Sequence, residues 1–367
     1  MILSALPAAA QYSVRRNGEV VQLVDTAAQT TVSVLTSVGN IAFEMKVKGQ
    51  DALRFPYASV EEFKKNPGAA GIPFLGPWAN RLDEQAFYAN GKKYIFNMGL
   101  GNVRGYNEGR IPLHGFLTTA SEWRVVEARS DDKSAWVTSR LEFYRQPMWM
   151  AQWPFAHTIE MTYRLQGGVL EVQTRIENLS AEPMPVAIGF HSFFQLTDSP
   201  RDAWTVAVGA RTQWLLSPDK IPTGETRPIE KFFPNPQAVP LKDYDLDHVF
   251  GDLVRDASGR AVMSVKGKSQ KLDVLFGPNY RAVVIFSPNP SAAPPAGRGG
   301  PPPGATPQSS PGRSSAGAQS RSFICFEAMA GITDAINLAH RGLYTDLQSV
   351  PPGGTWQASF WVRPSGF

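Results

Sequence analysis

Short runs in which hydrophobic and polar residues alternate dominate this sequence. Two of them, at 158–165 and 169–177, flank Gly167 and Gly168. Apolar residues recur in both runs with a period of two, and they are Ile159, Met161, Tyr163 and Leu165 before the glycines and Leu170, Val172 and Ile176 after them. A period of two on both sides of a Gly-Gly pair predicts an antiparallel β-hairpin.

Comparable runs recur along the rest of the chain. They predict strands at 20–24, 31–35, 41–47, 123–128, 136–143, 204–208, 261–265, 271–276, 282–286 and 355–362. Segments with a helical period are scarce, and only 60–65 predicts a helix, of one or two turns. Many short strands separated by turn signals indicate an all-β sandwich.

One segment interrupts the strand pattern. Residues 288–320 contain nine Pro and six Gly, no aromatic residue and two charged residues. This composition buries too little apolar surface to offset the entropy of ordering, so we expect a disordered insertion. A lid over an active site is the other interpretation of a connection this long. Its flanks, 282–286 and 323–327, have strand patterns, so the insertion interrupts a strand connection and we expect a single domain over 12–367.

Composition and charge indicate a folded protein without a nucleic-acid partner. Hydrophobic residues make up 43% of the 367 residues, which is enough for a large core. The net charge is only +4, and the densest basic run, 266–271, intersperses three lysines with Gly, Ser and Gln as an exposed turn does. Proteins that bind nucleic acids usually concentrate basic residues on one helix or stripe.

The single cysteine and the hydropathy of the chain exclude further classes. Cys325 alone cannot form an internal disulfide or a multi-thiolate metal site. No stretch of about 18 apolar residues is present, so we expect no membrane-spanning helix. Residues 1–11 lack a basic start, yet the alanines at 8–10 resemble the end of a signal-peptide cleavage site. We interpret 1–11 as a signal remnant or a flexible N-terminus, which leaves cytoplasmic and periplasmic locations open.

Among the five histidines, His191 has the setting that best suits a ligand. A strand over 186–191 would place His191 on the face that also carries Ala187 and Gly189. Small neighbours leave room for a ligand to approach the imidazole. A hydrogen-bonded histidine of the core is the alternative interpretation.

The other histidines have less distinctive settings. His114 lies between a proline and a glycine in an irregular segment, which suits either a functional or an exposed histidine. His248 follows Asp247, but this pair and the nearby carboxylate have no standard metal-ligand spacing, so we expect no metal site. His157 and His340 suit structural or surface positions.

Glu327 is the carboxylate with the clearest chemical potential. Alternation over 323–327 aligns Glu327 with Phe323 and Cys325 on an apolar face. A carboxylate that emerges from such a face loses solvation, which raises its pKa toward the range of a general base. A glutamate at a strand end that reaches water is the alternative.

Asn80 and Arg81 close a Gly/Pro-rich turn at 71–79. Both side chains can hydrogen-bond vicinal hydroxyl groups, and Trp78 could stack on a sugar face, although a plain surface loop fits equally well. The glycines near 99–105 do not follow the dinucleotide-binding spacing, and no Gly-x-Ser-x-Gly elbow is present. We therefore expect neither a nucleotide site nor a serine hydrolase.

Five segments in a fixed order carry a further signal. They are Asn80-Arg81-Leu82 with the following 90–97, Leu113-His114-Gly115, the region 189–196 around His191, Asp247-His248-Val249-Phe250, and Glu327 followed by Asp334-Ala335-Ile336-Asn337. Each motif alone is weak. Together, over nearly the whole chain, they resemble the motifs of the aldose 1-epimerase (galactose mutarotase) family.

This resemblance implies a galactose mutarotase-like β-supersandwich with a shallow sugar-binding cleft and neither a metal nor an organic cofactor. It implies that the chain interconverts the α and β anomers of a free hexose, glucose or galactose, by opening and reclosing the ring. Such a reaction needs one proton removed and one delivered. The roles that the resemblance implies are general base for Glu327, general acid for His191, and substrate binding for Asn80, Arg81, His114 and Asp247.

Two alternatives to this function stay open. The related hexose-6-phosphate 1-epimerases need basic groups for a phosphate, which Arg104 and Arg110 could supply. A non-catalytic carbohydrate-binding β-sandwich would not need both His191 and Glu327. In each case we expect a small-molecule sugar as partner, no nucleic acid and no membrane, and a monomer or weak dimer.

Overall fold

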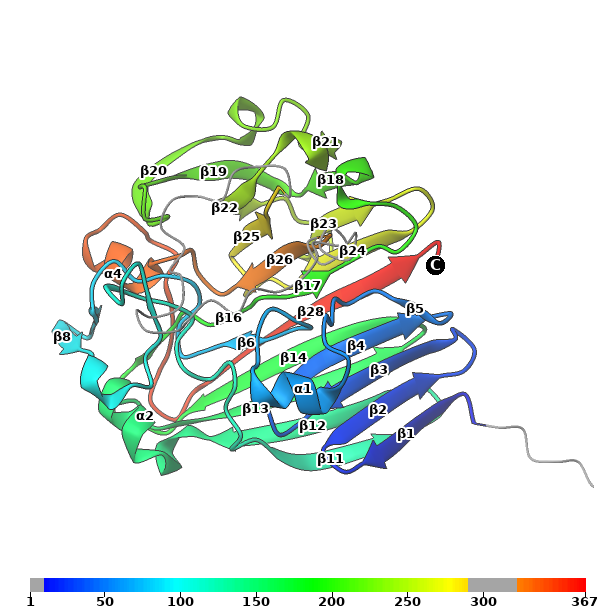
Figure 1. Cartoon of the computed structure of the whole chain (residues 1–367). Helices are drawn as coiled ribbons and strands as arrows, with labels where there is room; N and C mark the ends of the chain where they lie inside the picture. Colours follow the sequence, from blue (N-terminus) through cyan, green and yellow to red (C-terminus); the bar gives the residue numbers. More distant parts are fainter. Residues whose placement is uncertain (1–9, 290–321) are drawn as a thin grey trace, which may run out of the picture.

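The computed structural model describes residues 10–289 and 322–367, which fold mainly into β-strands (Figure 1). Most of the expected N-terminal segment and most of the expected insertion lie outside the described residues. The strands of the described part form three large antiparallel sheets and three small two-stranded ones. The prediction of an all-β sandwich is confirmed.

The largest sheet has nine strands and contains the predicted hairpin. In spatial order its strands are β11 (Arg124–Ser130), β12 (Ala135–Glu142), β13 (His157–Gln166), β14 (Val169–Asn178), β28 (Thr355–Ser365), β24 (Lys271–Phe276), β23 (Ala261–Lys266), β18 (Thr205–Val208) and β21 (Val239–Pro240). Gly167 and Gly168 connect β13 to β14 with φ of 56° and 73°. Glycine adopts this left-handed conformation without steric cost, so it suits the tight hairpin turn.

A five-stranded meander covers one end of the nine-stranded sheet (Figure 1). Its strands follow chain order: β1 (Tyr12–Asn17), β2 (Val20–Asp25), β3 (Thr30–Leu35), β4 (Ile41–Val47) and β5 (Gln50–Asp51). The Tyr163 hydroxyl on β13 donates to the Asn40 carbonyl at 2.7 Å across the sandwich. The apolar faces of the two sheets share one hydrophobic core.

An eight-stranded sheet covers the other end and carries most of the candidate site. Its order is β20 (Pro222–Pro228), β19 (Ala210–Leu216), β22 (Leu246–Leu253), β25 (Ala282–Ser287), β26 (Ile324–Met329), β16 (Gly189–Phe190) and β6 (Phe74–Leu75), with β17 (Phe193–Phe194) also paired to β26. The rings of Phe190 and Phe360, 5.0 Å apart, join it to the nine-stranded sheet. Strands β25 and β26, which flank the expected insertion, are direct antiparallel neighbours.

The remaining elements are short. Three two-stranded pairs are β7 (Ala86–Ala89) with β8 (Lys92–Ile95), β9 (Gly105–Tyr106) with β10 (Ile111–Pro112), and β15 (Met184–Val186) with β27 (Gln348–Val350). The helices are α1 (Val60–Lys65), α2 (Pro147–Gln152) and α4 (Ala335–His340), and the 3₁₀ turns are η1 (Met98–Leu100), η2 (Phe143–Arg145), η3 (Arg201–Ala203), η4 (Ile229–Lys231) and η5 (Leu241–Asp243). Helix α1 begins after Ser59, whose side chain accepts from the Glu62 N–H.

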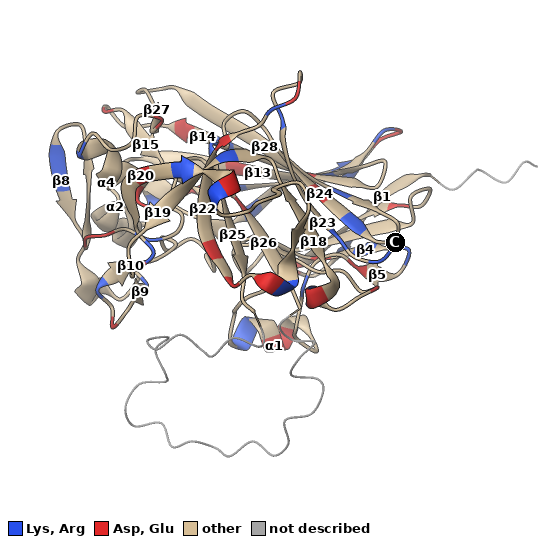
Figure 2. Cartoon of the chain, turned by 90° about the horizontal axis from the view of Figure 1, so that it is seen from above, with Lys and Arg blue, Asp and Glu red and all other residues tan. Residues whose placement is uncertain are grey.

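The elements predicted from alternation are confirmed, with ends that differ by three residues or fewer. The strand expected through 186–191 is an exception, because β15 ends at Val186 and β16 ends at Phe190. The basic run at 266–271 connects β23 to β24 as a turn, and the charged residues of both signs are scattered over the described chain (Figure 2). None of the helices in the described ranges is both long and apolar enough to span a bilayer.

Candidate active site

Strand register places two carboxylates on one face of the eight-stranded sheet. Glu327 on β26 pairs with Val284 on β25, which pairs with Val249 on β22. Cross-strand partners share a face, and so do residues two apart on one strand. Asp247, two residues before Val249, therefore lies on the same face as Glu327.

His191 faces Glu327 because the strand that carries it is interrupted. Strands β16 and β17 pair with different parts of β26, and His191 lies between them, opposite Glu327. Its Nε2 lies 3.2 Å from Oε1 of Glu327. The ring of Phe193 stacks on the imidazole at 4.5 Å and Phe286 meets it edge-on at 5.6 Å, which fixes the plane of the ring.

The turn that follows β6 adds a chain of polar contacts. Asn80 Nδ2 donates to Oε2 of Glu327 at 3.5 Å, a long hydrogen bond. Arg81 donates through Nη1 to Oδ1 of Asn80 at 2.9 Å and through Nη2 to Oδ2 of Asp247 at 3.0 Å. The guanidinium also lies over the ring of Tyr106, 5.0 Å from its centroid. The side chains of Asn80 and Arg81 together thus link Glu327 on β26 to Asp247 on β22.

His114 completes the group through two hydrogen bonds with Asn80. The Asn80 N–H donates to Nδ1 of His114 at 3.1 Å, and the His114 N–H donates to the Asn80 carbonyl at 2.8 Å. A nitrogen that accepts a hydrogen bond carries no proton, so the neutral ring has its hydrogen on Nε2. Both residues have left-handed φ, 60° for Asn80 and 63° for His114. Such conformations are uncommon outside glycine and cluster at functional sites.

Burial shifts the pKa values of the central groups toward their uncharged forms. Burial, with Asp247 nearby, raises the pKa of Glu327 well above its ordinary value. Burial lowers the pKa of His191 to about 4, and it holds the pKa of His114 well below the ordinary range, with His191 and Arg81 acting in the same direction. Burial thus favours the neutral carboxyl group of Glu327 beside the neutral imidazole of His191, a pair that shares one proton. One member of such a pair can give up a proton while the other accepts one.

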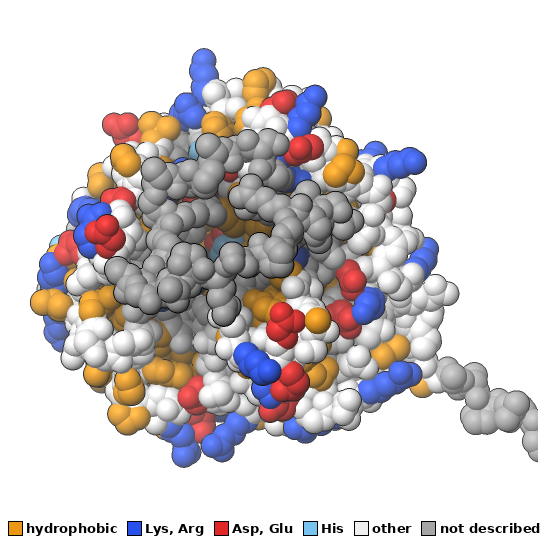
Figure 3. Space-filling model, in the orientation of Figure 1, with side chains coloured by type: hydrophobic (Ala, Val, Ile, Leu, Met, Phe, Trp, Pro, Cys, Tyr) orange, Lys and Arg blue, Asp and Glu red, His pale blue; other side chains and the backbone are white. Residues whose placement is uncertain are grey.

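A cleft of about 480 Å³ reaches this pair at His191, which is part of its lining, whereas Glu327 is not. His114, His191, Arg104 and the rings of Phe193 and Phe286 contribute to its lining. Histidine and hydrophobic side chains are visible near the middle of the face shown in Figure 3. The side chain of Glu327 is only 2% exposed, whereas that of His191 is 14% exposed. A ligand in the cleft would thus meet the histidine first, and the carboxyl group of Glu327 lies behind it.

A second buried cluster, around Asp334, holds the turn that carries Asn80 and Arg81 in place. The Asp334 N–H donates to the Arg81 carbonyl at 3.1 Å, and Oδ1 of Asp334 accepts from the Asp83 N–H at 3.1 Å. Arg341 contacts the carboxyl groups of both Asp83 and Asp334, and Asn337 Nδ2 donates to Asp83 at 2.9 Å. Burial, together with Asp83, raises the pKa of Asp334 to about 8.

The structure brings together the side chains that sequence singled out as a site, which are Asn80, Arg81, His114, His191, Asp247 and Glu327. Sequence reasoning missed Tyr106, which lies on the two-residue strand β9, too short to show a periodic signal. It also missed the supporting role of Asp334, although the segment that begins there was part of the resemblance.

The predicted sugar contact of Trp78 is wrong. Its side chain is 0% exposed, and its ring packs on Phe96 at 4.8 Å and near Trp153 at 6.4 Å. The Gly/Pro-rich sequence around it suggested an exposed turn. A bridge between Trp78 and Ala187 instead places the indole in the core.

Two basic residues expected near the cleft have different positions. Arg104 lines the cleft, whereas Arg110 lines a separate pocket beside Asp219. His248 lies outside the cleft lining, where its Nδ1 accepts from the Asp247 N–H and its ring packs on Phe232. In the described ranges, no group of three or more His, Cys, Asp or Glu side chains is arranged to hold a metal ion.

Comparison with protein families identifies relatives of the whole fold. A family model described as aldose 1-epimerase matches residues 22–363. A galactose mutarotase-like protein from Clostridium acetobutylicum is 20% identical, with 95% of each chain covered and a TM-score of 0.75. An aldose epimerase homologue from C. elegans is 17% identical, with 92% of this chain and 96% of that one covered and a TM-score of 0.67. Galactose 1-epimerase from Lactobacillus acidophilus is 14% identical, with 96% of this chain and 97% of that one covered and a TM-score of 0.68.

Proposed function

The chain belongs to the aldose 1-epimerase family, and on this premise we propose that it interconverts the α and β anomers of a free hexose, glucose or galactose. The observation that carries the proposal is the contact of 3.2 Å between Nε2 of His191 and Oε1 of Glu327 beneath the cleft. Ring opening of a hemiacetal needs a base for the anomeric hydroxyl and an acid for the ring oxygen. These two side chains supply one of each.

In the proposed reaction, Glu327 is the general base and His191 the general acid. Glu327 takes the proton of the anomeric hydroxyl, the carbonyl forms at C1, and the bond from C1 to the ring oxygen breaks. His191 protonates that oxygen as it leaves. Rotation about C1–C2 and attack of the same oxygen on the other carbonyl face then give the other anomer, with the two residues in exchanged roles.

The number of protons that Glu327 and His191 hold without a ligand fits this cycle. Burial favours a neutral carboxyl group beside a neutral imidazole, and catalysis needs a carboxylate beside an imidazolium. Both forms contain one proton, so the change requires only its transfer across the contact between the two side chains. Asn80 and Arg81 favour the carboxylate form of Glu327, and the charge of Asp247 raises the pKa of His191 against the effect of burial.

The remaining site residues bind and orient the sugar in this proposal. His114 keeps a neutral ring with its hydrogen on Nε2, so it can donate to an oxygen near the anomeric centre. Asn80, Arg81 and Asp247 form a hydrogen-bonded array whose unused lone pairs and N–H groups suit sugar hydroxyls. The array spans several strands, so it is stiff before the sugar arrives, which limits the entropy lost on binding.

Polarimetry tests the proposal directly. The change of optical rotation of freshly dissolved α-D-glucose and α-D-galactose is followed with the wild-type protein and with Glu327→Gln side by side. Acceleration by the wild type alone supports both the activity and the base. Failure to accelerate either sugar contradicts the free-hexose proposal, and equal acceleration by both proteins contradicts the role of Glu327.

One observation favours a second candidate, a hexose 6-phosphate as substrate. Arg104 lines the cleft, and no residue in the described ranges forms an ion pair with it. A guanidinium in this position could bind a phosphate dianion. Glucose 6-phosphate should then compete far better than glucose, and salt should weaken that competition. Sugar binding without any effect on anomer exchange would instead indicate the non-catalytic binding module.

A further inference from the structure

A tyrosine that no motif singled out covers the arginine at the centre of the site. Arg81 uses two nitrogens in the plane of its guanidinium, Nη1 for Asn80 and Nη2 for Asp247. One face of this plane lies over the ring of Tyr106, with 5.0 Å between Cζ and the ring centroid. An aromatic face attracts a cation, and the attraction is stronger where water is excluded. The Arg81 side chain is only 11% exposed, so this contact is largely shielded from water.

The pairing of three short segments brings the two side chains together. Tyr106 on β9 is paired with Ile111 on β10, and Arg81 forms an antiparallel bridge with Leu113, two residues further along the chain. Paired residues share a face, and so do residues two apart in an extended segment. Tyr106 and Arg81 therefore lie on the same side of the segment that connects their partners.

The hairpin that carries Tyr106, residues 105–112, is anchored outside the site. Asn107 and Glu108 in its turn have left-handed φ of 52° and 60°. Such conformations are strained and persist where surrounding contacts hold them. Nδ2 of Asn107 donates to Oδ1 of Asp219 at 2.7 Å, in the turn that connects β19 to β20. The hairpin is thus tied to the eight-stranded sheet, so the ring has a defined position beside Arg81.

The ring of Tyr106, and not its hydroxyl group, makes the contact with Arg81. Tyr106 is half-buried, and among the residues that the structure describes its hydroxyl has no hydrogen-bond partner. The guanidinium is therefore in contact with the part of the side chain that phenylalanine would share. This separates the ring from the hydroxyl in a test by substitution.

We propose that Tyr106 is a positioning residue, whose ring holds the guanidinium of Arg81 so that a sugar meets a preformed array of Asn80, Arg81 and Asp247. Without the ring, the long arginine side chain gains rotational freedom, and ordering it again on binding costs conformational entropy. The array binds the sugar before and during ring opening alike, so its loss should raise KM more than it lowers kcat. This inference rests on the proposed epimerase activity.

Two substitutions at position 106 test the role of the ring by polarimetry. Tyr106→Leu removes the aromatic face, and we expect KM to rise about fivefold. We expect kcat to change by less than about twofold, and the melting temperature to stay close to that of the wild type. Tyr106→Phe keeps the aromatic face and should restore the wild-type KM.

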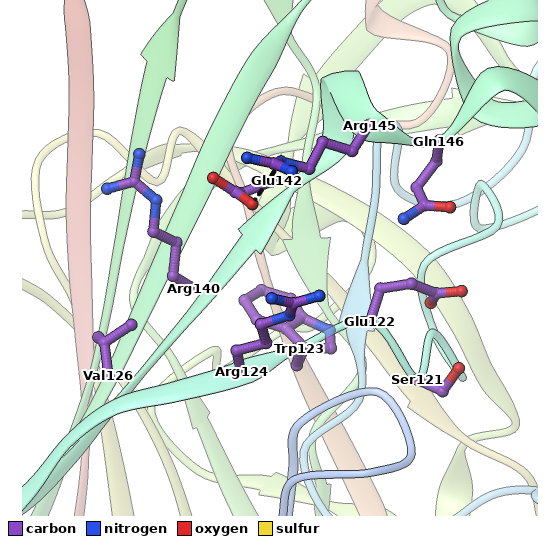
Figure 4. A pocket seen from close by; sticks show the side chains of 9 residues that line it. All are labelled: Ser121, Glu122, Trp123, Arg124, Val126, Arg140, Glu142, Arg145 and Gln146. Carbon is purple, nitrogen blue, oxygen red and sulfur yellow. Dashed lines mark ion pairs between the residues drawn. The ribbon is translucent and has the colours of Figure 1, made fainter.

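Tyr144 provides the matched control. Its ring lies under the guanidinium of Arg145, with 5.6 Å from Cζ to the ring centroid. Figure 4 shows Arg145 and its ion pair with Glu142 at a separate pocket, and neither Tyr144 nor Arg145 lines the cleft. Tyr144→Leu removes the same kind of contact outside the site, so it should change neither KM nor kcat.

The Nε–H of Arg81 provides a readout that needs no sugar. In the described part of the chain this nitrogen is buried and has no hydrogen-bond partner, so exchange of its proton with water reports how well the guanidinium is covered. In ¹H–¹⁵N spectra, where Arg81→Lys identifies the signal by its loss, we expect equal exchange in the wild type and Tyr106→Phe. In Tyr106→Leu the exchange should be about tenfold faster.

Three results would overturn the proposal. They are an unchanged KM or an unchanged Nε–H exchange rate in Tyr106→Leu, a KM that rises as much in Tyr106→Phe, and a kcat that falls together with the melting temperature. The second would assign the effect to the hydroxyl group, and the third would make Tyr106 a purely structural residue. If the wild type accelerates neither sugar, the proposed activity fails, and the exchange rates still decide whether the ring holds Arg81.

Discussion

The turn that carries Asn80 and Arg81 has a buried carboxyl group on each side, and the two groups have different surroundings. Glu327 lies behind His191 of the cleft lining and has a long contact of 3.5 Å with Asn80 and one of 3.2 Å with His191. Asp334 faces helix α4 and receives the Asp83 N–H as well as Arg341. Burial raises the pKa of both carboxyl groups.

A raised pKa alone therefore does not identify a catalytic acid or base. Asp334 is fully buried and coordinated on several sides, so its carboxyl group stabilises the turn but meets no ligand. Glu327 has fewer partners and lies beneath a cleft, where a hydroxyl group can supply the missing contact. Strongly shifted carboxyl groups occur both in structural networks and at functional sites, and geometry decides between them.

Exchanging each carboxyl group for an amide tests this difference, and Glu327→Gln should have the largest effect. The amide keeps the shape but cannot take a proton, so we expect kcat to fall about 10³-fold, within the range for a general base. Sugar binding, measured by calorimetry, should persist. A variant that keeps half of the wild-type rate in polarimetry would contradict the assignment.

His191→Asn should have the next largest effect. Loss of the imidazole removes the acid and should lower kcat about 10²-fold or more, while the melting temperature changes little. Polarimetry and thermal unfolding measured on the same sample check both parts. A melting temperature that falls together with the activity would favour a histidine whose role is structural.

Asp334→Asn makes the same exchange in the structural cluster and should reduce kcat far less than Glu327→Gln does. Because the pKa of Asp334 in the fold, about 8, exceeds its ordinary 3.8, its contribution to stability is present below pH 3.8 and is lost as the pH rises toward 8. The amide resembles the protonated form and should remove this loss, on the order of 2 kcal/mol. Urea unfolding at pH 5 and pH 8 measures it. An identical pH dependence in both proteins would show that Asp334 is ionised throughout.

His157 and His191 allow the same comparison between two buried histidines, and substitution of His157 should have the smallest effect on activity. Burial lowers the pKa of His157 to about 4, as it does for His191, but His157 stacks on Phe143 in the core. A pKa below the ordinary 6.5 means that stability is present above pH 6.5 and is lost as the pH falls toward 4.

In the wild type, the free energy of unfolding should therefore fall by about 2 kcal/mol between pH 7 and pH 5 because of His157. This part of the loss should be absent in His157→Gln. Its anomerisation rate at pH 7 should equal that of the wild type. Urea titrations at pH 7 and pH 5 provide the measurement. A large drop in the rate would mean that the core and the cleft are coupled.

The strands that alternation of apolar and polar residues indicates could be predicted from the sequence. Alternation is a property of neighbouring residues, so the hairpin of β13 and β14 and strand β4 could be predicted from it. Helices α2 and α4 are only six residues long and carry no helical period that could have revealed them. The position of Trp78 was misjudged because a polar turn can still be buried when another segment covers it.

The site depended on contacts that no local pattern contains. His191 meets Glu327 only because β16 and β17 both pair with β26, more than a hundred residues away in the chain. The residue types suggested an acid and a base, and the ordered motifs of the family supplied the reason to combine them. The cluster around Asp334 involves the Arg81 carbonyl and the Asp83 N–H of the turn, so sequence could not indicate its role.

The place of β28 in the nine-stranded sheet bears on how the protein is made in the cell. Among the described strands of this sheet β28 comes last in the sequence, yet it lies between β14 and β24 and connects the two halves of the sheet. Translation proceeds from the N-terminus, so both halves are made with an unpaired edge. Those edges can pair with other nascent chains until β28 is made. We therefore expect the sheet to be completed late, and a chain that stops before β28 to be an aggregation-prone product rather than a shorter working protein.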